Sequence, residues 1–545
     1  MRFRWLAALA VALFSTGLAS AQPKAAEPTV EVRLRSVDDL VNKFEYVAGL
    51  AGKEDAVGQV RELIKVLSAD GKGIAGIDPK KPIGAYAALE KDITTSPVVI
   101  LVPIADEKAF LDALGNFNLT PEKGDDGTHK IDVPLKGGVV LPVHLRFANG
   151  YVYGSQKASD LNPKTLIAPK AYFAKDDGAV ASLLVHLDRV PADLKTFLMG
   201  QIELGIADER KKNEANQSAA EKQLAGLIFD SFLSAAKGLS DDGKYLSVKV
   251  FVDDKTDELL AELTLTAKSG SATAKNFTGL AGKTSLPAGI VATTGPAARA
   301  NVKVAVTDGT KKEFAAAIDA LLADAVKNAP NDDARDNMKQ FATAFGPTLK
   351  AGELDAAASL AGPDAKGHYQ LLAALAVKDG KGIEKFVKKI DEDYGAFIAE
   401  FITFKFDVET VGDFALHRID VKGADEKFEK LFGTKTIWLA TSDKHLALSI
   451  ESEGKALRAG LKAKAIPAPV VSGEVAAAKL LPLFDSDLKP DELKALLKDA
   501  FGDGPTTGKD TASASVAGGD KLTVKFKVKG KALRLGAGLE LLKGK

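Results

Sequence analysis

The chain of 545 residues carries 73 basic and 73 acidic side chains, so its formal net charge is zero. No overall field draws such a chain to nucleic acid or to an anionic membrane, and we expect no nucleic-acid partner. A hydrophobic content of 46% predicts a folded protein, and the absence of cysteine excludes disulfides, a thiol nucleophile and a lipid-modified cysteine.

The first predicted element is a secretory signal peptide at residues 1–21. Arg2 and Arg4 form its basic start, residues 5–14 its apolar centre, and Ala19-Ser20-Ala21 its cleavage site. The apolar centre is too short to cross a bilayer, and no later stretch approaches about 18 apolar residues. We therefore expect an exported protein, periplasmic or extracellular, without a transmembrane segment.

Five phrases in the first half of the chain recur in the second half in the same order. The most similar pair is HKIDVP at His129–Pro134 and HRIDVK at His417–Lys422. The other pairs are Pro97–Leu114 with Tyr369–Ile390, Val143–Ser155 with Thr436–Ser452, Leu183–Phe197 with Val470–Phe484, and Tyr245–Val252 with Lys521–Val528. This order predicts a tandem duplication of a unit of roughly half the chain.

The alternation of strands, hairpins and helices predicts an α+β fold with two homologous halves. Each half is expected to have an antiparallel or mixed sheet with helices packed on one face. We place the first repeat at residues 30–268 and the second at 301–545. Residues 269–300, rich in Gly, Ala, Thr and Pro, are expected to be a linker region whose first part is a short helix, and Gly502–Asp520 is expected to be a loop.

A helical hairpin is predicted between Pro191 and Leu239, because two apolar stripes with helical spacing flank a polar run at 207–223. The stripes are Leu194, Phe197, Leu198 and Ile202, then Leu224, Leu227, Ile228 and Phe232.

The repeated phrase offers a histidine close to an aspartate, so we ask whether it is a site or a piece of scaffold. In a strand, His129 and Ile131 lie on one face, and Lys130 and Asp132 lie on the other. The second copy repeats this pattern with His417 and Ile419 against Arg418 and Asp420. The histidine and aspartate of one copy therefore cannot pair, and we interpret the phrase as scaffold. A histidine of one half meeting a carboxylate of the other half stays open.

Two motifs resemble a nucleotide-binding or a catalytic sequence, and we reject both as functional sites. Gly279–Ser285 (GLAGKTS) resembles the end of a phosphate-binding loop, but Phe277 stands where that loop needs glycine. Ser234–Lys237 matches S-x-x-K without the partner motifs of the penicillin-binding enzymes. Single histidines are interpreted as ordinary strand or surface residues, namely His144, His186, His368 and His445. We assign no catalytic residue, no cofactor and no metal site.

Charged clusters have plain interpretations as well. Three acidic pairs precede glycine, which is typical of turns, with calcium binding as the alternative. They begin at Asp125, Asp176 and Asp241. Lys525, Lys527 and Lys529 alternate with apolar residues, which favours a solvent-facing strand over a surface for anionic lipid or polysaccharide.

One segment carries a family resemblance. Gly71–Leu89 (GKGIAGIDPKKPIGAYAAL) and the following SPVVILVPIADEKAFLDALG have an I-D-P-x-x-P-x-G phrase before a V-P-I-x-D-x-x-x-F strand. The matching positions are Ile77, Asp78, Pro79, Pro82 and Gly84, then Val102, Pro103, Ile104, Asp106 and Phe110. Over roughly residues 30–161 the chain resembles a family of uncharacterised secreted proteins of planctomycete-type bacteria. The resemblance implies an envelope or periplasmic location and carries no catalytic residues.

The sequence thus predicts an exported binding or structural protein without evident catalysis. Many small apolar residues favour, as one alternative, a carrier that holds a lipid or another apolar ligand. A second alternative is a hydrolase that uses carboxylates at a cleft between the halves. The partner, either a protein or an apolar small ligand, is not identified by any motif.

Overall fold

The computed structural model describes residues 27–66, 75–135, 138–174, 177–214, 217–293, 295–484, 489–502 and 508–543. The predicted signal peptide lies outside these residues. The protein is of mixed α+β type, with 42% helix and 31% strand, and its strands form antiparallel sheet. The chain divides into two compact units. One comprises the chain up to Met199, Leu239–Ser271 and the residues from Lys527; the other comprises Gly200–Gly238 and Ala272–Phe526.

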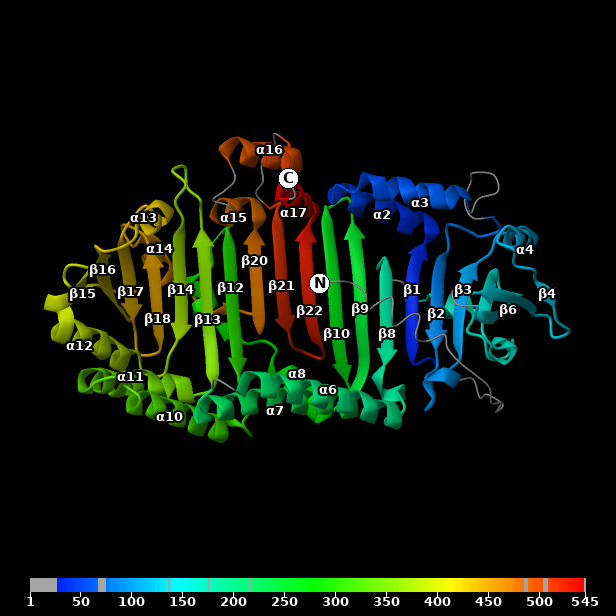
Figure 1. Ribbon diagram of the computed structural model, residues 1–545. Coiled ribbons are helices and arrows are strands. Elements are labelled where there is room, and N and C mark those ends of the chain that lie inside the picture. The colour runs from blue at the N-terminus through cyan, green and yellow to red at the C-terminus, as the bar shows by residue number, and fades with distance from the viewer. Residues whose placement is uncertain are drawn as a thin grey trace. The chain divides into compact units, whose positions relative to one another are not determined.

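In the first unit the strands follow the order β4-β5-β6-β7-β3-β2-β1-β8-β9-β10, and each is antiparallel to its neighbours (Figure 1). Their bounds are β1 (Val30–Ser36), β2 (Pro82–Ala87), β3 (Val98–Pro103), β4 (Glu122–Lys123), β5 (His129–Pro134), β6 (Val140–Ala148), β7 (Tyr151–Ser155), β8 (Ala181–His186), β9 (Gly243–Asp253) and β10 (Glu258–Ala267).

Two helices of the first unit begin where a side chain caps them. Ser36 Oγ accepts the backbone N–H of Asp39 at 3.2 Å at the start of α2, and Asp106 accepts that of Ala109 at 2.9 Å at the start of α4. The bounds are α2 (Val37–Leu50), α3 (Glu54–Val66), α4 (Glu107–Gly115), α5 (Pro169–Tyr172) and α17 (Gly530–Lys543). The predicted hairpin consists of α6 (Ala192–Glu214) and α7 (Ala219–Asp242), which both cross the division between the units.

The core of the first unit is aromatic. Tyr86, Leu101 and Tyr153 from the sheet pack with Leu161 and Tyr172 from the segment after β7. The hydroxyl of Tyr172 donates to backbone carbonyls of the sheet, at 2.7 Å from Ala85 O and 3.0 Å from Val32 O. One face of β2, β3 and β7 is therefore covered by the segment that carries α5.

In the second unit the strand order is β15-β16-β17-β18-β14-β13-β12-β20-β21, and the next neighbour is β22, which crosses the division between the units at Lys527 (Figure 1). The bounds are β12 (Ala298–Ala305), β13 (Glu353–Ala361), β14 (Gln370–Ala376), β15 (Ile402–Val411), β16 (Phe414–Val421), β17 (Thr436–Thr441), β18 (His445–Ile450), β20 (Val471–Ala476), β21 (Thr511–Ala517) and β22 (Leu522–Lys529). A small separate pair joins β11 (Thr284–Ser285) and β19 (Ile466–Pro467).

The helices of the second unit are α8 (Ala272–Gly279), α9 (Leu286–Ile290), α10 (Lys311–Lys327), α11 (Asp332–Lys350), α12 (Gly380–Ile398), α13 (Glu426–Phe432), α14 (Lys455–Gly460), α15 (Ala477–Phe484) and α16 (Pro490–Phe501). Its core lies on one sheet face, where Leu372, Ala374 and Leu416 pack under Ile290 of α9 and Leu457 of α14.

In the segment 269–300, α8 is the expected short helix, and the part after it, expected to be a linker, is folded as well. Ser285 Oγ accepts the N–H of Ala288 at 3.0 Å, and Pro287 fits the first turn, so α9 starts at a capped position. Ile290 and Val291 are then buried in the core. The loop expected at Gly502–Asp520 also contains regular structure, because its alternating residues 511–517 form β21 beside β20.

The two units share one strand order. The recurring phrases fall at corresponding places for β3 and β14, β5 and β16, β6-β7 and β17-β18, and β8 and β20. The fifth pair of phrases does not correspond in this way. Tyr245–Val252 lies in β9, the strand next to β8. Lys521–Val528 lies mostly in β22, whereas the strand next to β20 is β21. That pairing was wrong by one strand.

Candidate functional site

The second unit has an apolar sheet face opposite its core. Residues that stand directly opposite each other in antiparallel strands point to the same face, so the pairing defines rows of neighbouring side chains. The first row is Leu439, Leu448, Ala373, Ala358, Ala300, Gly473 and Ala514. The next is Thr441, Leu446, Leu375, Ala356, Val302, Val471 and Val516. Figure 1 views β12, β13, β14 and β20 from a side on which no helix crosses them.

This face is hollowed over β12, β13 and β14. The hollow has a volume of about 570 Å³, and alanines form much of its floor, with Ala300, Ala358 and Ala373 side by side. Its polar lining residues, Asn301 and Ser472, stand in the row of the core residues Ala357 and Ala374, so their side chains point to the other face of the sheet and offer little to a ligand. The hollow therefore suits a small apolar molecule, within the usual range of about 300–1,000 Å³ for ligand pockets.

The apolar surface extends beyond the hollow. Val471 and Val475 of β20 are 42% and 38% exposed, and Val304 and Leu354 at the other end of the face are exposed as well. Continuous exposed apolar surface on a folded protein marks an interaction site or a ligand groove. In the part of the chain that the structure describes, this face is thus the strongest candidate for function.

Helices α11 and α12 adjoin one end of the hollow. Phe345 of α11 and Phe386 of α12 belong to a cluster with Leu375 and Leu446, which line the hollow. Ile383 of α12 is buried in the same cluster. The position of α12 therefore helps to define the end of the hollow.

A polar ring holds α12 to the sheet beside this cluster. The buried His417 of β16, 1% exposed, accepts the backbone N–H of Asp407 at its Nδ1, with an N–N distance of 3.1 Å. Its Nε2 lies 3.0 Å from Thr441 Oγ1, and that hydroxyl donates to Glu384 Oε2 at 2.8 Å. Lys388 closes the ring by donating to Glu384 Oε1 at 2.6 Å and to Asp407 Oδ2 at 2.7 Å.

The ring fixes the proton positions. Because the carboxylate of Glu384 accepts the hydroxyl proton of Thr441, the hydroxyl oxygen accepts the proton of His417 Nε2. Nδ1 is therefore unprotonated, as its contact with the N–H of Asp407 requires. Burial lowers the pKa of His417 below its ordinary value, although Glu384 and Asp407 oppose this effect.

The side chains of Glu384, Asp407 and His417 approach one another within 4.8 Å, as the ligands of a metal ion would. The ammonium of Lys388 already bonds both carboxylates. Since a cation would have to displace this ammonium, we interpret the cluster as an internally neutralised polar ring and assign no metal to it.

The first unit has a comparable apolar face. One row across its sheet is Ile100, Ala85, Val32, Leu183, Val248 and Leu263, and the next is Ile83, Leu34, Ala181, Val250 and Ala261. Ile100 and Val250 are 36% and 38% exposed. Both units thus combine one core-bearing face with one apolar face on the other side of the sheet.

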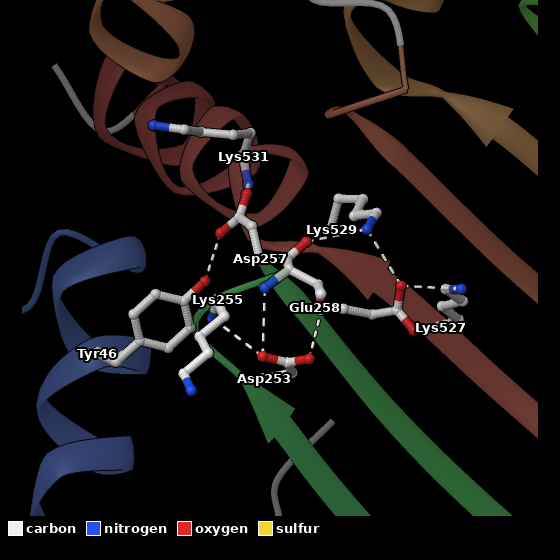
Figure 2. A network of polar contacts seen from close by, with 9 residues as sticks. Tyr46, Asp253, Lys255, Asp257, Glu258, Lys527, Lys529 and Lys531 are labelled. Atoms are coloured by element: carbon white, nitrogen blue, oxygen red, sulfur yellow. Dashed lines mark hydrogen bonds and ion pairs between the residues drawn. The ribbon is translucent and has the colours of Figure 1, made fainter.

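The basic stripe at the C-terminus belongs to a charge network of the first unit (Figure 2). Lys527 Nζ and Lys529 Nζ lie 2.8 Å and 3.1 Å from Glu258 Oε2. In the same network Asp257 accepts the phenolic proton of Tyr46 and the N–H of Lys531. These two lysines are paired within the protein, which favours the structural interpretation of the stripe.

The repeated phrase forms β5 and part of β16 with the expected surface pairs. Lys130 Nζ lies 3.2 Å from Asp132, and Arg418 Nε donates to Asp420 at 2.9 Å. The contacts of His417 with Thr441 and with the backbone of Asp407 were missed, because no local spacing links these residues.

A second missed pair joins His186, interpreted as an isolated histidine, to Glu31. The distance from His186 Nε2 to Glu31 Oε1 is 2.8 Å. The two residues lie in neighbouring strands β8 and β1, far apart in the sequence.

The predicted hairpin stripes do not enter the core. Phe197 is 60% exposed and Phe232 is 59% exposed, although both lie in helices as expected. Among the helices of the described residues, none is long and apolar enough to cross a bilayer.

No protein-family model, no curated protein and no solved structure matches this chain. The resemblance based on Ile77 to Phe110 therefore stays a prediction, and function has to be inferred from the geometry described above.

Proposed function

We propose that this protein is exported and binds an apolar ligand, of the acyl-chain kind, on the open sheet face of its second unit. The hollow of about 570 Å³ over β12, β13 and β14 carries this proposal. Its floor presents methyl groups of alanine, and the side chains of Asn301 and Ser472 point to the other face of the sheet. Binding of an apolar ligand to such a surface is favoured because it removes apolar area from water, and the surface offers no charge to an ionic ligand.

The shared strand order supports a tandem duplication as the origin of the two units. On this proposal the apolar face of the first unit is a second version of the same surface. The N-terminal sequence, with its basic start, apolar centre and small-residue cleavage site, supports export. A role outside the cytoplasm fits a protein whose ligand is poorly soluble in water.

The test is a titration of the mature protein with a fluorescent fatty acid, compared with the variants Ala300→Glu and Ala305→Glu. Both alanines are exposed residues of β12, but they point to opposite faces. A carboxylate at position 300 would have to be desolvated by an apolar ligand. At the site of the second unit we expect at least tenfold weaker binding in Ala300→Glu and unchanged binding in Ala305→Glu. Equal binding to both variants, or no binding to the unmodified protein, would reject the proposal.

A further inference from the structure

The polar ring around His417 links the protonation state of one imidazole to the position of α12. Four elements contribute to it: α12 through Glu384 and Lys388, β15 through Asp407, β16 through His417, and β17 through Thr441. These are the charged and hydrogen-bonding groups that face the imidazole. The ring of Phe406, 5.6 Å away between centroids, is an apolar neighbour.

The same helix adjoins the hollow. Phe386 of α12 belongs to the cluster that contains the hollow residues Leu375 and Leu446, and Leu446 stands directly opposite Thr441 of the ring. A shift of α12 would therefore change the end of the hollow, while the ring determines whether α12 is held.

We propose that His417 is a proton-sensitive latch, which holds α12 at the end of the hollow when neutral and releases it when protonated. The inference rests on the proposed function, since it concerns the regulation of the same apolar site. His417 is a positioning residue here, because it acts on the ligand through α12.

The proton would enter at Nδ1, the only ring nitrogen without one. There it converts an acceptor into a donor, so the backbone N–H of Asp407 loses its partner and faces a positive charge. The carboxylate of Asp407, whose Oδ1 is 3.8 Å from Nδ1, is the nearest alternative partner. If it turns to the imidazolium, it leaves Lys388, and one of the bonds that hold α12 is lost.

The direction of the response follows from linkage. Burial disfavours the charged imidazole in the closed ring, so an open state in which water reaches His417 binds the proton more tightly. Acidification below the ordinary histidine pKa of about 6.5 therefore shifts the population toward the open state. We expect weaker ligand binding at acid pH.

The experiment measures the dissociation constant of a fluorescent fatty acid at pH 7.5 and pH 5.0 for three proteins. For the site of the second unit, the unmodified protein should bind about tenfold more weakly at the lower pH. His417→Gln, which cannot take up a proton at this position, should have nearly the same dissociation constant at both pH values. His129→Gln changes the corresponding strand of the other unit and should keep the tenfold ratio.

The outcomes separate the latch from the proposed function. If the unmodified protein binds equally well at both pH values, or if His417→Gln keeps the tenfold ratio, the latch is wrong and the proposed function stands. Absence of binding at both pH values would reject the proposed function itself.

Hydrogen exchange of the unmodified protein covers the case in which His417→Gln does not fold. After correction for intrinsic rates, amides of α12 should lose protection at pH 5.0 relative to those of α10. Equal changes in the two helices would also overturn the latch.

Discussion

Ala300 of β12 and Ala358 of β13 stand directly opposite each other on the open face, in the floor of the hollow. Two larger side chains at this pair would fill the space that we assign to a ligand. The hollow therefore depends on the small size of these residues, whereas most sheet positions gain stability from larger ones.

Ala358→Leu should shorten the longest ligand that fits. The added methylene groups would occupy part of the hollow, so affinity should fall for long-chain fatty acids and change little for short-chain ones. Dissociation constants across a series of chain lengths measure this effect. Ala305→Leu makes the same change on the other face of β12 and should leave these dissociation constants unchanged. If both variants changed the dissociation constants in the same way, the hollow would not be the binding site.

Val250→Glu should abolish a second bound ligand, because Val250 lies on the apolar face of the first unit. We expect two equivalents of fluorescent fatty acid per unmodified chain and one per variant chain, counted by native mass spectrometry. Ser247→Glu adds the same charge to the opposite face of β9 and should retain two. A count of one for the unmodified chain would confine binding to the second unit.

Tyr46→Phe should destabilise the first unit without affecting ligand binding. The phenol of Tyr46 donates to Asp257, and its loss leaves that carboxylate with fewer donors (Figure 2). Hydrogen bonds to charged groups contribute about 1.5–3 kcal/mol, so the free energy of unfolding should fall by about that amount. Urea denaturation followed by circular dichroism gives the value, and a change below about 0.5 kcal/mol would show that the bond adds little to stability.

The second unit should lose stability as the pH falls below about 6.5. The pKa of His417 is lowered in the folded protein, so the unfolded chain takes up the proton first. The contribution of His417 to the free energy of unfolding is complete above pH 6.5 and decreases by at most about 1.4 kcal/mol for each pH unit below that value. The lowered pKa of Glu384 adds a further loss only at more acid pH, below about 4.5.

Urea denaturation followed by the fluorescence of Trp438 measures this slope, since Trp438 is buried in the second unit and the other tryptophan lies in the predicted signal peptide. His417→Gln should reduce the slope between pH 7.5 and pH 5.0, and the part that remains is expected from His445, because burial lowers the pKa of that imidazole as well. A slope that is identical in the variant would assign the pH dependence to other groups.

Much of the fold could be predicted from local patterns. The alternation in HKIDVP and HRIDVK identifies both strands and their surface pairs, and the stripes at Phe197 and Phe232 identify two helices. The part of the segment 269–300 after α8 was misjudged because its composition suggests a linker, while its packing depends on Ile290 meeting a sheet formed by distant strands.

The candidate site could not be predicted in the same way. A strand such as β14, with the sequence QLLAALA, is apolar on both faces and is typical of a strand buried on both sides. Only the register shows that Ala373 joins Ala358 and Ala300 on the open face, while Leu372 and Ala374 enter the core. The ring around His417 depends likewise on contacts with Glu384 and Thr441 that no sequence spacing encodes.

The most direct test of ligand binding is native mass spectrometry of the protein, expressed with its predicted signal peptide in a bacterial periplasm, before and after solvent extraction. We expect an additional mass that is bound in stoichiometric amount, is released by extraction and is identified as an acyl-chain compound. A bare polypeptide mass in both samples, together with no uptake of added fatty acid, would contradict it.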